Sequence, residues 1–177
     1  LTLGLKPLLA AAGRSRVINV VSGGMYSQKL SMKHLVSPKT EKFSGATAYA
    51  RAKRALMVVT QRWATQWRKD GITVNAMHPG WADTPGVETS LPTFHAVTRF
   101  ALRSPAEGAD TIVWLAAATE AAKLSGQLLL DREPQTLYLV KGTRESAQER
   151  KKLFEFLEQY TPVEAAEILE QRRKKAS

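Results

Sequence analysis

Cysteine is absent from the 177-residue sequence, and its absence removes several kinds of chemistry at once. The chain can form no disulfide bond, no thiolate metal site and no cysteine nucleophile. Long hydrophobic runs are missing too, since none approaches the roughly 20 residues that a transmembrane helix needs. Nothing near Leu1 resembles a cleavable signal sequence. The composition is typical of a soluble protein, leaves its compartment open, and allows one ordinary domain with a sizeable core.

Acidic residues are scarce relative to basic ones, with 16 Asp and Glu against 26 Lys and Arg, which gives a formal net charge of +10. A positive field attracts anionic partners such as nucleic acid, membrane surfaces or phosphorylated cofactors. The basic residues are nevertheless spread over helices that also carry glutamate. No stacking aromatic residues alternate with a basic strip, as they do in nucleic-acid binders. We therefore predict no nucleic-acid partner and assign most of the charge to solvated helix faces.

A glycine-rich phosphate loop of the form G-x-G-x-x-G is also missing. The chain instead starts in mid-pattern, because leucines at positions 1, 3, 5, 8 and 9 predict the closing turns of an apolar helix that ends at Gly13. A protein does not usually begin inside a helix. We therefore expect the chain to be the C-terminal part of a longer fold or a natural truncated form.

The rest of the sequence alternates between strand and helix patterns. The β-branched run Arg16–Ser22 predicts a buried strand opening into a glycine turn, and the run 71–77 predicts a second strand. Between them, apolar residues at helical spacing predict one buried stripe on a helix from Thr47 to Asp70, formed by Leu56, Val59, Trp63 and Trp67. Ser-Pro-Ala-Glu at 104–107 is a helix start, and 126–131 predicts a last buried strand. The pattern predicts an α/β fold with parallel strands.

Tyr49 and Lys53 lie four residues apart in the predicted helix, so their side chains share one face. A neighbouring ammonium favours the phenolate, which would make Tyr49 a better proton donor or acceptor near neutral pH. The same spacing also fits a tyrosine at a helix edge beside a solvated lysine. Chemistry is favoured because Ser22 follows one strand and Pro79-Gly80 follows the next. Active sites of open α/β sheets lie at such carboxyl ends of strands.

Together these residues resemble the short-chain dehydrogenase/reductase family. Its fingerprint combines a serine after the fifth strand, Tyr-x-x-x-Lys on the next helix, and Pro-Gly-x-x-x-Thr after the sixth strand. The corresponding residues here are Ser22, Tyr49-Ala-Arg-Ala-Lys53 and Pro79-Gly80-Trp-Ala-Asp-Thr84. Longer matches around Ser22 and His78 resemble one branch of the family. The resemblance covers about residues 1–139.

The resemblance implies the C-terminal, catalytic part of a Rossmann-like doubly wound sheet at 1–140, followed by a charged helical extension at 141–177. Ser22, Tyr49 and Lys53 would be catalytic, and Tyr49, Lys53, Pro79, Gly80 and Thr84 would contact the cofactor. That cofactor would be NAD or NADP, with the choice open, and the substrate a small carbonyl compound or alcohol. The family uses the tyrosine helix in dimer interfaces, so a homo-oligomer is also implied.

Two connecting segments are expected near the substrate. The polar connection between Met25 and Phe43 and the proline-containing segment 81–103 are long enough to be functional loops. The resemblance places the first over the substrate pocket and makes the second a lid or substrate loop. His78 and His95 belong to no cluster with metal-ligand spacing, so we predict no metal site.

The absence of a cofactor-binding loop favours a second function for the chain itself. A truncated, non-catalytic form could act as an interaction module. Binding of reduced nicotinamide cofactor would distinguish the two functions, because an interaction module does not need it.

Overall fold

The computed structural model describes residues 1–36, 43–82 and 102–159. Its centre is a four-stranded sheet in the order β1-β2-β3-β4, and the strands are β1 (Ser15–Val20), β2 (Ile72–Met77), β3 (Leu128–Leu130) and β4 (Glu133–Pro134). The first three strands pair in parallel, and β4 adds a short antiparallel edge. The predicted α/β class with parallel strands is confirmed, whereas β4 was not predicted.

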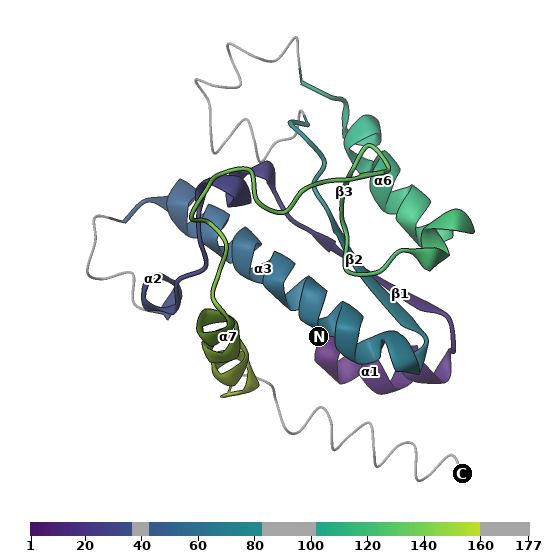
Figure 1. Ribbon diagram of the computed structural model, residues 1–177. Helices are drawn as coiled ribbons and strands as arrows, with labels where there is room; N and C mark the ends of the chain where they lie inside the picture. The colour runs from purple at the N-terminus through teal and green to yellow at the C-terminus, as the bar shows by residue number, and fades with distance from the viewer. Residues whose placement is uncertain (37–42, 83–101, 160–177) are drawn as a thin grey trace.

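Two crossover helices cover opposite sides of the sheet (Figure 1). Helix α3 (Gly45–Trp67) joins β1 to β2, and α6 (Pro105–Ala117) joins β2 to β3. Side chains alternate between the faces of a strand. Accordingly Val17 packs with the core beside α3, and its neighbour Ile18 packs with the core beside α6. This doubly wound arrangement brings the carboxyl ends of the parallel strands to one end of the sheet.

Local sequence explains where these helices begin. Ser44 accepts a hydrogen bond from the backbone N–H of Thr47, which satisfies one of the unpaired donors in the first turn of α3. Ser104 and Glu107 form the complete reciprocal capping box at the start of α6. The predicted start of α6 is therefore confirmed. Within α6, Leu115 is buried and Val113 is exposed.

Gly71 lies where the chain turns from η3 (Arg68–Asp70) into β2, with a positive φ of 71°. A Cβ atom at Gly71 would lie 2.4 Å from the carbonyl oxygen of Gly13, whereas a Cβ at Gly13, φ 75°, would meet nothing within 4 Å. Both glycines have a left-handed backbone, which disfavours any residue with a Cβ atom. Only Gly71 has, in addition, a close contact with another backbone segment, so the two positions can be compared directly.

We expect Gly13→Ala to lower the free energy of unfolding by about 1 kcal/mol, the usual cost of alanine in this conformation. Gly71→Ala should cost at least about 2 kcal/mol more, because backbone must move to admit the methyl group. Urea denaturation of both variants would measure the difference. Equal losses would mean that Gly13 and Gly71 do not approach each other closely.

Helix α1 (Thr2–Ala11) lies beside β1 and contributes Leu9 and Ala10 to the core shared with α3. Leu3, Leu5 and Leu8 of this helix do not join the core and are exposed, as is Leu1 just before it. No described strand pairs with the outer edge of β1, so the backbone groups on that side are unpaired within the described sheet. Among the described residues, both this strand edge and the four leucines are therefore left uncovered.

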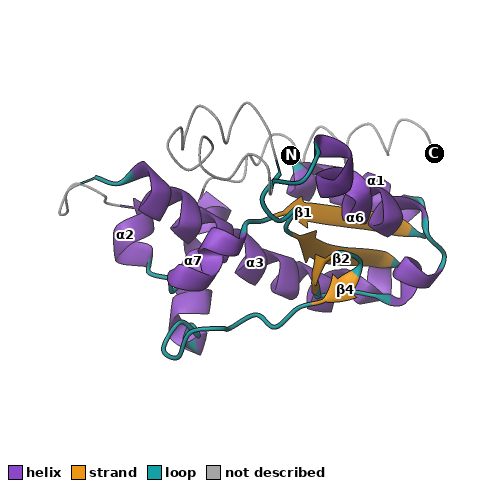
Figure 2. Cartoon of the chain, turned by 90° about the horizontal axis from the view of Figure 1, so that it is seen from above, coloured by secondary structure: helices purple, strands orange, loops and turns teal. Residues whose placement is uncertain are grey.

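A third layer of helix covers the side of α3 that faces away from the strands (Figure 2). Helices α2 (Met32–Val36) and α7 (Ala147–Gln159) pack there around Val58 and Val59, with Leu153 and Phe154 at the centre of α7. The predicted single stripe is therefore wrong, because Trp67 faces the sheet while Val59 faces α7. The polar connection between Met25 and Phe43 also contains unpredicted structure, namely η1 (Gly23–Ser27) and α2.

The described part of the chain contains no helix that is both long and apolar enough to cross a membrane. Helix α7 lies in the segment predicted to be a helical extension, although the division of the chain at residue 140 stays a prediction. The implied homo-oligomer stays a prediction too, and the side of α3 that carries Val58 and Val59 is occupied by α2 and α7 of the same chain.

Candidate active site

Ser22 lies directly beyond the carboxyl end of β1. The strand stays paired up to this point, since the Val21 N–H donates to the Met77 carbonyl at 2.8 Å. Ser22 then caps η1, and its hydroxyl accepts a hydrogen bond from the Gly24 N–H at 3.3 Å. The hydroxyl is thus held at the sheet end by a short, ordered turn.

Tyr49 and Lys53 lie one turn apart near the start of α3, as predicted. The Lys53 Nζ is 5.3 Å from the centroid of the Tyr49 ring, and the Tyr49 side chain is 54% exposed. Lys53 also donates a hydrogen bond of 2.9 Å to the carbonyl of Val20, the last residue of β1. One lysine therefore contacts both the tyrosine and the strand end that precedes Ser22.

The turn that carries Ser22 packs directly against α3. A Cβ built on Gly24 would lie 3.7 Å from the Cβ of Ala50, the residue after Tyr49. This is an ordinary van der Waals distance, so η1 and α3 lie within side-chain contact of each other at this point. The structure thus brings Ser22, Tyr49 and Lys53 to the same end of the sheet, on neighbouring segments.

Pro79 and Gly80 follow β2 at this same end. The His78 N–H donates to the Leu129 carbonyl at 3.0 Å, and a Cβ on Gly23 would lie 3.9 Å from the His78 ring. Gly80 has a positive φ of 72°, and a Cβ there would lie 3.0 Å from the Arg103 guanidinium. The Pro-Gly turn therefore lies next to η1, and a side chain at Gly80 would crowd the Arg103 guanidinium.

Arg103 was not predicted, but it fixes the base of the segment expected to be a lid. It forms a two-pronged ion pair with Asp131, with one N–O contact of 2.7 Å, and its backbone pairs with Trp81 and Ala82. The described residues on either side of the segment 83–101 thus lie together beside the Pro-Gly turn. Its interior, which includes Thr84 and His95, lies outside the described residues, so the predicted role of Thr84 stays a prediction.

His78 is a buried group that no spacing pattern assigned to this site. Burial lowers the pKa of its imidazole, the Arg103 guanidinium lowers it further, and Asp131 partly opposes both. The ring is therefore uncharged near neutral pH, and its Nδ1 accepts a hydrogen bond of 3.3 Å from the Gly80 N–H. Tyr26, also missed, stands edge-on to this ring and donates to the Thr136 carbonyl. Both side chains pack beside the turns that contain Ser22 and Gly80.

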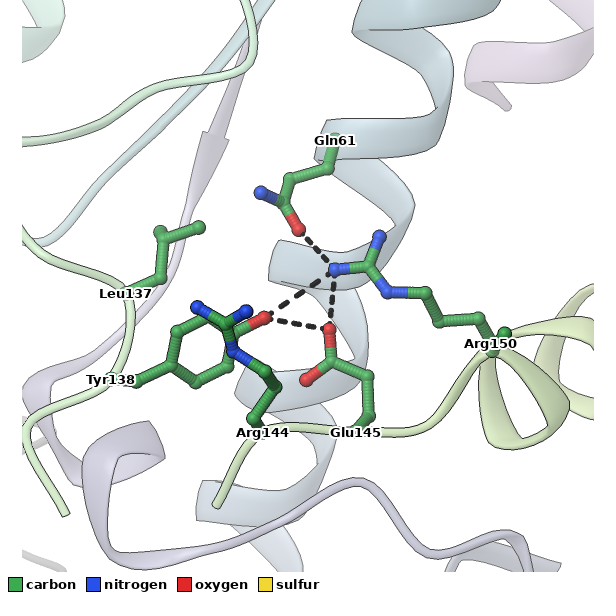
Figure 3. Close-up of a pocket in the computed structure, with 7 residues that line it drawn as sticks. Gln61, Leu137, Tyr138, Arg144, Glu145 and Arg150 are labelled. Carbon is green, nitrogen blue, oxygen red and sulfur yellow. Dashed lines mark hydrogen bonds and ion pairs between the residues drawn. The ribbon is translucent and has the colours of Figure 1, made fainter. Parts of the chain in front are cut away.

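Two pockets lie on the other side of α3. The larger, about 410 Å³, is lined by Gln61, Tyr138, Arg144, Glu145 and Arg150 among others. Figure 3 shows that several of these side chains hydrogen-bond to one another, and that Arg150 donates to Gln61, Tyr138 and Glu145. The smaller, about 270 Å³, lies among η1, α2 and α3. Neither pocket is lined by Ser22, Tyr49 or Lys53.

The parallel sheet with helices on both faces and polar residues at its carboxyl end defines a Rossmann-like α/β protein. The chain belongs to the short-chain dehydrogenase/reductase family. A family model described as enoyl-(acyl carrier protein) reductase matches residues 18–130, which is more than half of the chain. The family resemblance expected from the sequence is confirmed.

Named relatives extend the match to most of the chain. Human dehydrogenase/reductase SDR family member 12 is 47% identical over 161 residues, covering 90% of this chain and 50% of the relative, and the bovine protein is 45% identical with the same coverage. The crystal structure of 3-oxoacyl-[acyl-carrier protein] reductase from Brucella melitensis is 28% identical, with a TM-score of 0.52, and covers 71% of this chain and 43% of that chain. The chain spans about half the length of the curated relatives it matches.

Proposed function

We propose that this chain supplies the catalytic half of a nicotinamide-dependent oxidoreductase that interconverts a carbonyl compound and an alcohol. One observation carries the proposal: Lys53 contacts the Tyr49 ring and, at the same time, donates to the carbonyl of Val20, two residues before Ser22. This contact couples the helix that bears the acid or base to the strand end that bears the second hydroxyl. A structural lysine at a helix surface would need neither partner.

The donor groups at this end of the sheet fit a nicotinamide nucleotide. A lysine ammonium has three N–H donors, and Lys53 uses one of them on Val20, which leaves donors for ribose hydroxyls. Pro79 and Gly80 lie at the same end of the sheet as Lys53, and by family resemblance this turn would lie beside the nicotinamide ring. By family resemblance, Thr84 would donate to the carboxamide. When bound, the nicotinamide supplies the hydride.

The side chains of this chain would bind and protonate the substrate. Ser22 would donate a hydrogen bond to the substrate oxygen and hold it in place. The Tyr49 hydroxyl, which makes no hydrogen bond to any described residue, would pass the proton as general acid in reduction and accept it in oxidation. Lys53 would stabilise the phenolate left on Tyr49 after proton transfer.

The open edge of β1 supports the view that a cofactor-binding half completes the site. An unpaired parallel edge is the kind of surface that further strands of the same sheet cover. A phosphate-binding glycine loop would then come from those strands. The same edge also favours the second candidate function, an interaction module that adds to a strand of another protein.

Titration with NADH and NADPH, followed by nicotinamide fluorescence, separates the two functions. We would compare the 177-residue chain with a joined protein, in which the N-terminal half of the human relative precedes the chain. The joined protein should bind one or both cofactors saturably, and the chain alone should bind at least about tenfold more weakly because it lacks a phosphate loop. A joined protein that folds, as judged by circular dichroism, but binds neither cofactor would support the interaction module.

A further inference from the structure

His78 lies where three segments meet at the carboxyl end of the sheet. It directly follows β2, and its backbone N–H donates to the Leu129 carbonyl of β3 at 3.0 Å. Its side chain lies beside η1, since a Cβ built on Gly23 would be 3.9 Å from the imidazole Cε1 atom. The residue is only 9% exposed. One buried ring thus lies beside the turn that begins at Ser22 and belongs to the strand that leads to Pro79.

The imidazole also holds the turn that follows it. Its Nδ1 atom accepts a hydrogen bond of 3.3 Å from the N–H of Gly80, two residues further along the chain. An asparagine or aspartate side chain makes the same kind of contact in an Asx turn. Gly80 has a positive φ of 72° and, as a glycine, has more backbone freedom than any other residue. The hydrogen bond to His78 restricts that freedom at the Pro79-Gly80 turn.

Tyr26 holds the imidazole in place from a third side. The two rings are edge-on, with centroids 6.4 Å apart, and the Tyr26 hydroxyl donates to the Thr136 carbonyl at 2.8 Å. The phenol is uncharged near neutral pH, because burial raises its pKa more than the Arg54 charge lowers it. An acceptor that is already ordered loses less entropy when it forms a bond. The His78 ring is therefore prepared to accept from Gly80.

The charged groups around His78 favour its neutral form. Burial lowers the pKa of the imidazole, the Arg103 guanidinium lowers it further, and the Asp131 carboxylate partly opposes both. A proton on Nδ1 would replace the acceptor by a second donor, and this donor would face the Gly80 N–H. Only the neutral ring can therefore hold the turn.

We propose that His78 is a positioning residue of the reaction site, because its Nδ1 atom holds the Pro79-Gly80 turn while its ring packs beside the turn that carries Ser22. The inference rests on the proposed function, in which the Pro-Gly turn lies beside the nicotinamide and Ser22 holds the substrate oxygen. Hydride transfer needs both bound molecules at the correct separation, and a displacement of about 1 Å is enough to slow such a reaction. His78 acts through these two turns and does not need to touch either molecule.

The site should therefore respond to acid. Because the pKa of His78 is lowered in the folded chain, the unfolded chain takes up the proton first as the pH falls. The contribution of the neutral ring to stability is complete above the ordinary pKa of about 6.5, and it is lost as the pH falls from there through the lowered value. Within the folded chain, the hydrogen bond to Gly80 is lost when the pH reaches the lowered pKa.

Two substitutions separate the acceptor from the bulk of the ring. The side-chain oxygen in His78→Asn is attached to Cγ, as Nδ1 is, so it can accept from the Gly80 N–H, and it does not titrate. His78→Leu keeps a side chain of similar size without an acceptor. Amide hydrogen exchange of Gly80 in the 177-residue chain, measured by NMR at neutral pH, should be at least about fivefold faster in His78→Leu. The rate in His78→Asn should be close to that of the wild type.

Cofactor affinity of the joined protein tests the effect on the site. The dissociation constant of the nicotinamide cofactor should rise at least about fivefold in His78→Leu and stay within about twofold of the wild type in His78→Asn. As the pH falls below about 6.5, the wild type should lose affinity relative to His78→Asn. A histidine that only fills space would give neither the recovery in His78→Asn nor this difference in pH dependence. The matched control is His34→Asn, which removes a histidine of α2 and should keep the wild-type pH profile.

Either of two results overturns the inference. One is equal Gly80 exchange in the wild type and His78→Leu, and the other is the same pH profile of cofactor binding in the wild type and His78→Asn. The second comparison remains decisive even if circular dichroism shows that His78→Leu does not fold. A joined protein that folds but binds no cofactor refutes the proposed function instead, and Gly80 exchange, which needs no cofactor, then decides whether His78 holds the turn.

Discussion

Tyr49→Phe in the joined protein should reduce turnover of a carbonyl substrate by at least about 10² to 10⁴-fold, the usual contribution of a general acid or base. The substitution keeps the ring and removes the hydroxyl. Because Tyr49 is 54% exposed and its hydroxyl bonds to no described residue, the fold should not change. Initial rates of NADH or NADPH oxidation, with a panel of carbonyl compounds, would measure the loss. Cofactor affinity should stay close to that of the unmodified protein, since Lys53 remains.

Tyr138→Phe is the matched control for this experiment. It also removes one phenol hydroxyl, but from a residue that bonds to Glu145 on the other side of α3. Its turnover should remain, even if its stability falls by about 1 kcal/mol for the lost hydrogen bond. Unchanged turnover in Tyr49→Phe would refute the catalytic assignment. Equal losses in both variants would point to a general effect on α3.

Local sequence patterns were sufficient to predict the elements that position the candidate site. The positions of Ser22 and Pro79-Gly80 follow from short β-branched runs that end in turns, which is information contained within a few neighbouring residues. Tyr49 and Lys53 follow from helical spacing alone. The structure places these residues at one end of the sheet, as the pattern predicted, while their chemical roles stay predictions.

Contacts between distant segments could not be predicted in the same way. Arg103 and Asp131 are 28 residues apart and no periodicity links them, yet they form an ion pair, and the Arg103 guanidinium lies against Gly80 of the Pro-Gly turn. The outer face of α3 was assigned to a single stripe, because helical spacing reports which residues share a face and not which partner covers that face. Packing of α2 and α7 decides that question, and it depends on tertiary structure.

Arg54 is the clearest example of a residue whose contacts with distant segments could not be predicted from the sequence. Its replacement should have the largest effect on stability. In sequence it is one more cation on a charged helix. In the structure it is 1% exposed, donates to the Gln28 carbonyl at 3.1 Å and to the Leu137 carbonyl at 2.9 Å, and lies 5.1 Å from the centroid of the Tyr138 ring. Burial lowers the pKa of its guanidinium, and the negative charge of Glu145 opposes that shift.

Arg54→Met should lower the free energy of unfolding by about 3 to 5 kcal/mol, the usual cost of removing one partner from a buried charge cluster. Two carbonyls would lose their donors, and the buried Glu145 carboxylate would keep Arg150 as its cationic partner. Urea denaturation would measure the loss. Arg68→Met, which removes an exposed arginine from η3, should stay within about 0.5 kcal/mol of wild type.

A second substitution separates charge from hydrogen bonding in this cluster. The Glu145 Oε2 atom is buried and has no hydrogen-bond partner, so its charge is compensated through the field of Arg54 and the bond to Arg150. Glu145→Gln added to Arg54→Met removes the poorly compensated charge and should recover about 1 to 2 kcal/mol of the loss, whereas Glu145→Gln alone should be destabilising. No recovery in the double variant would mean that Arg54 acts mainly through its two carbonyl contacts.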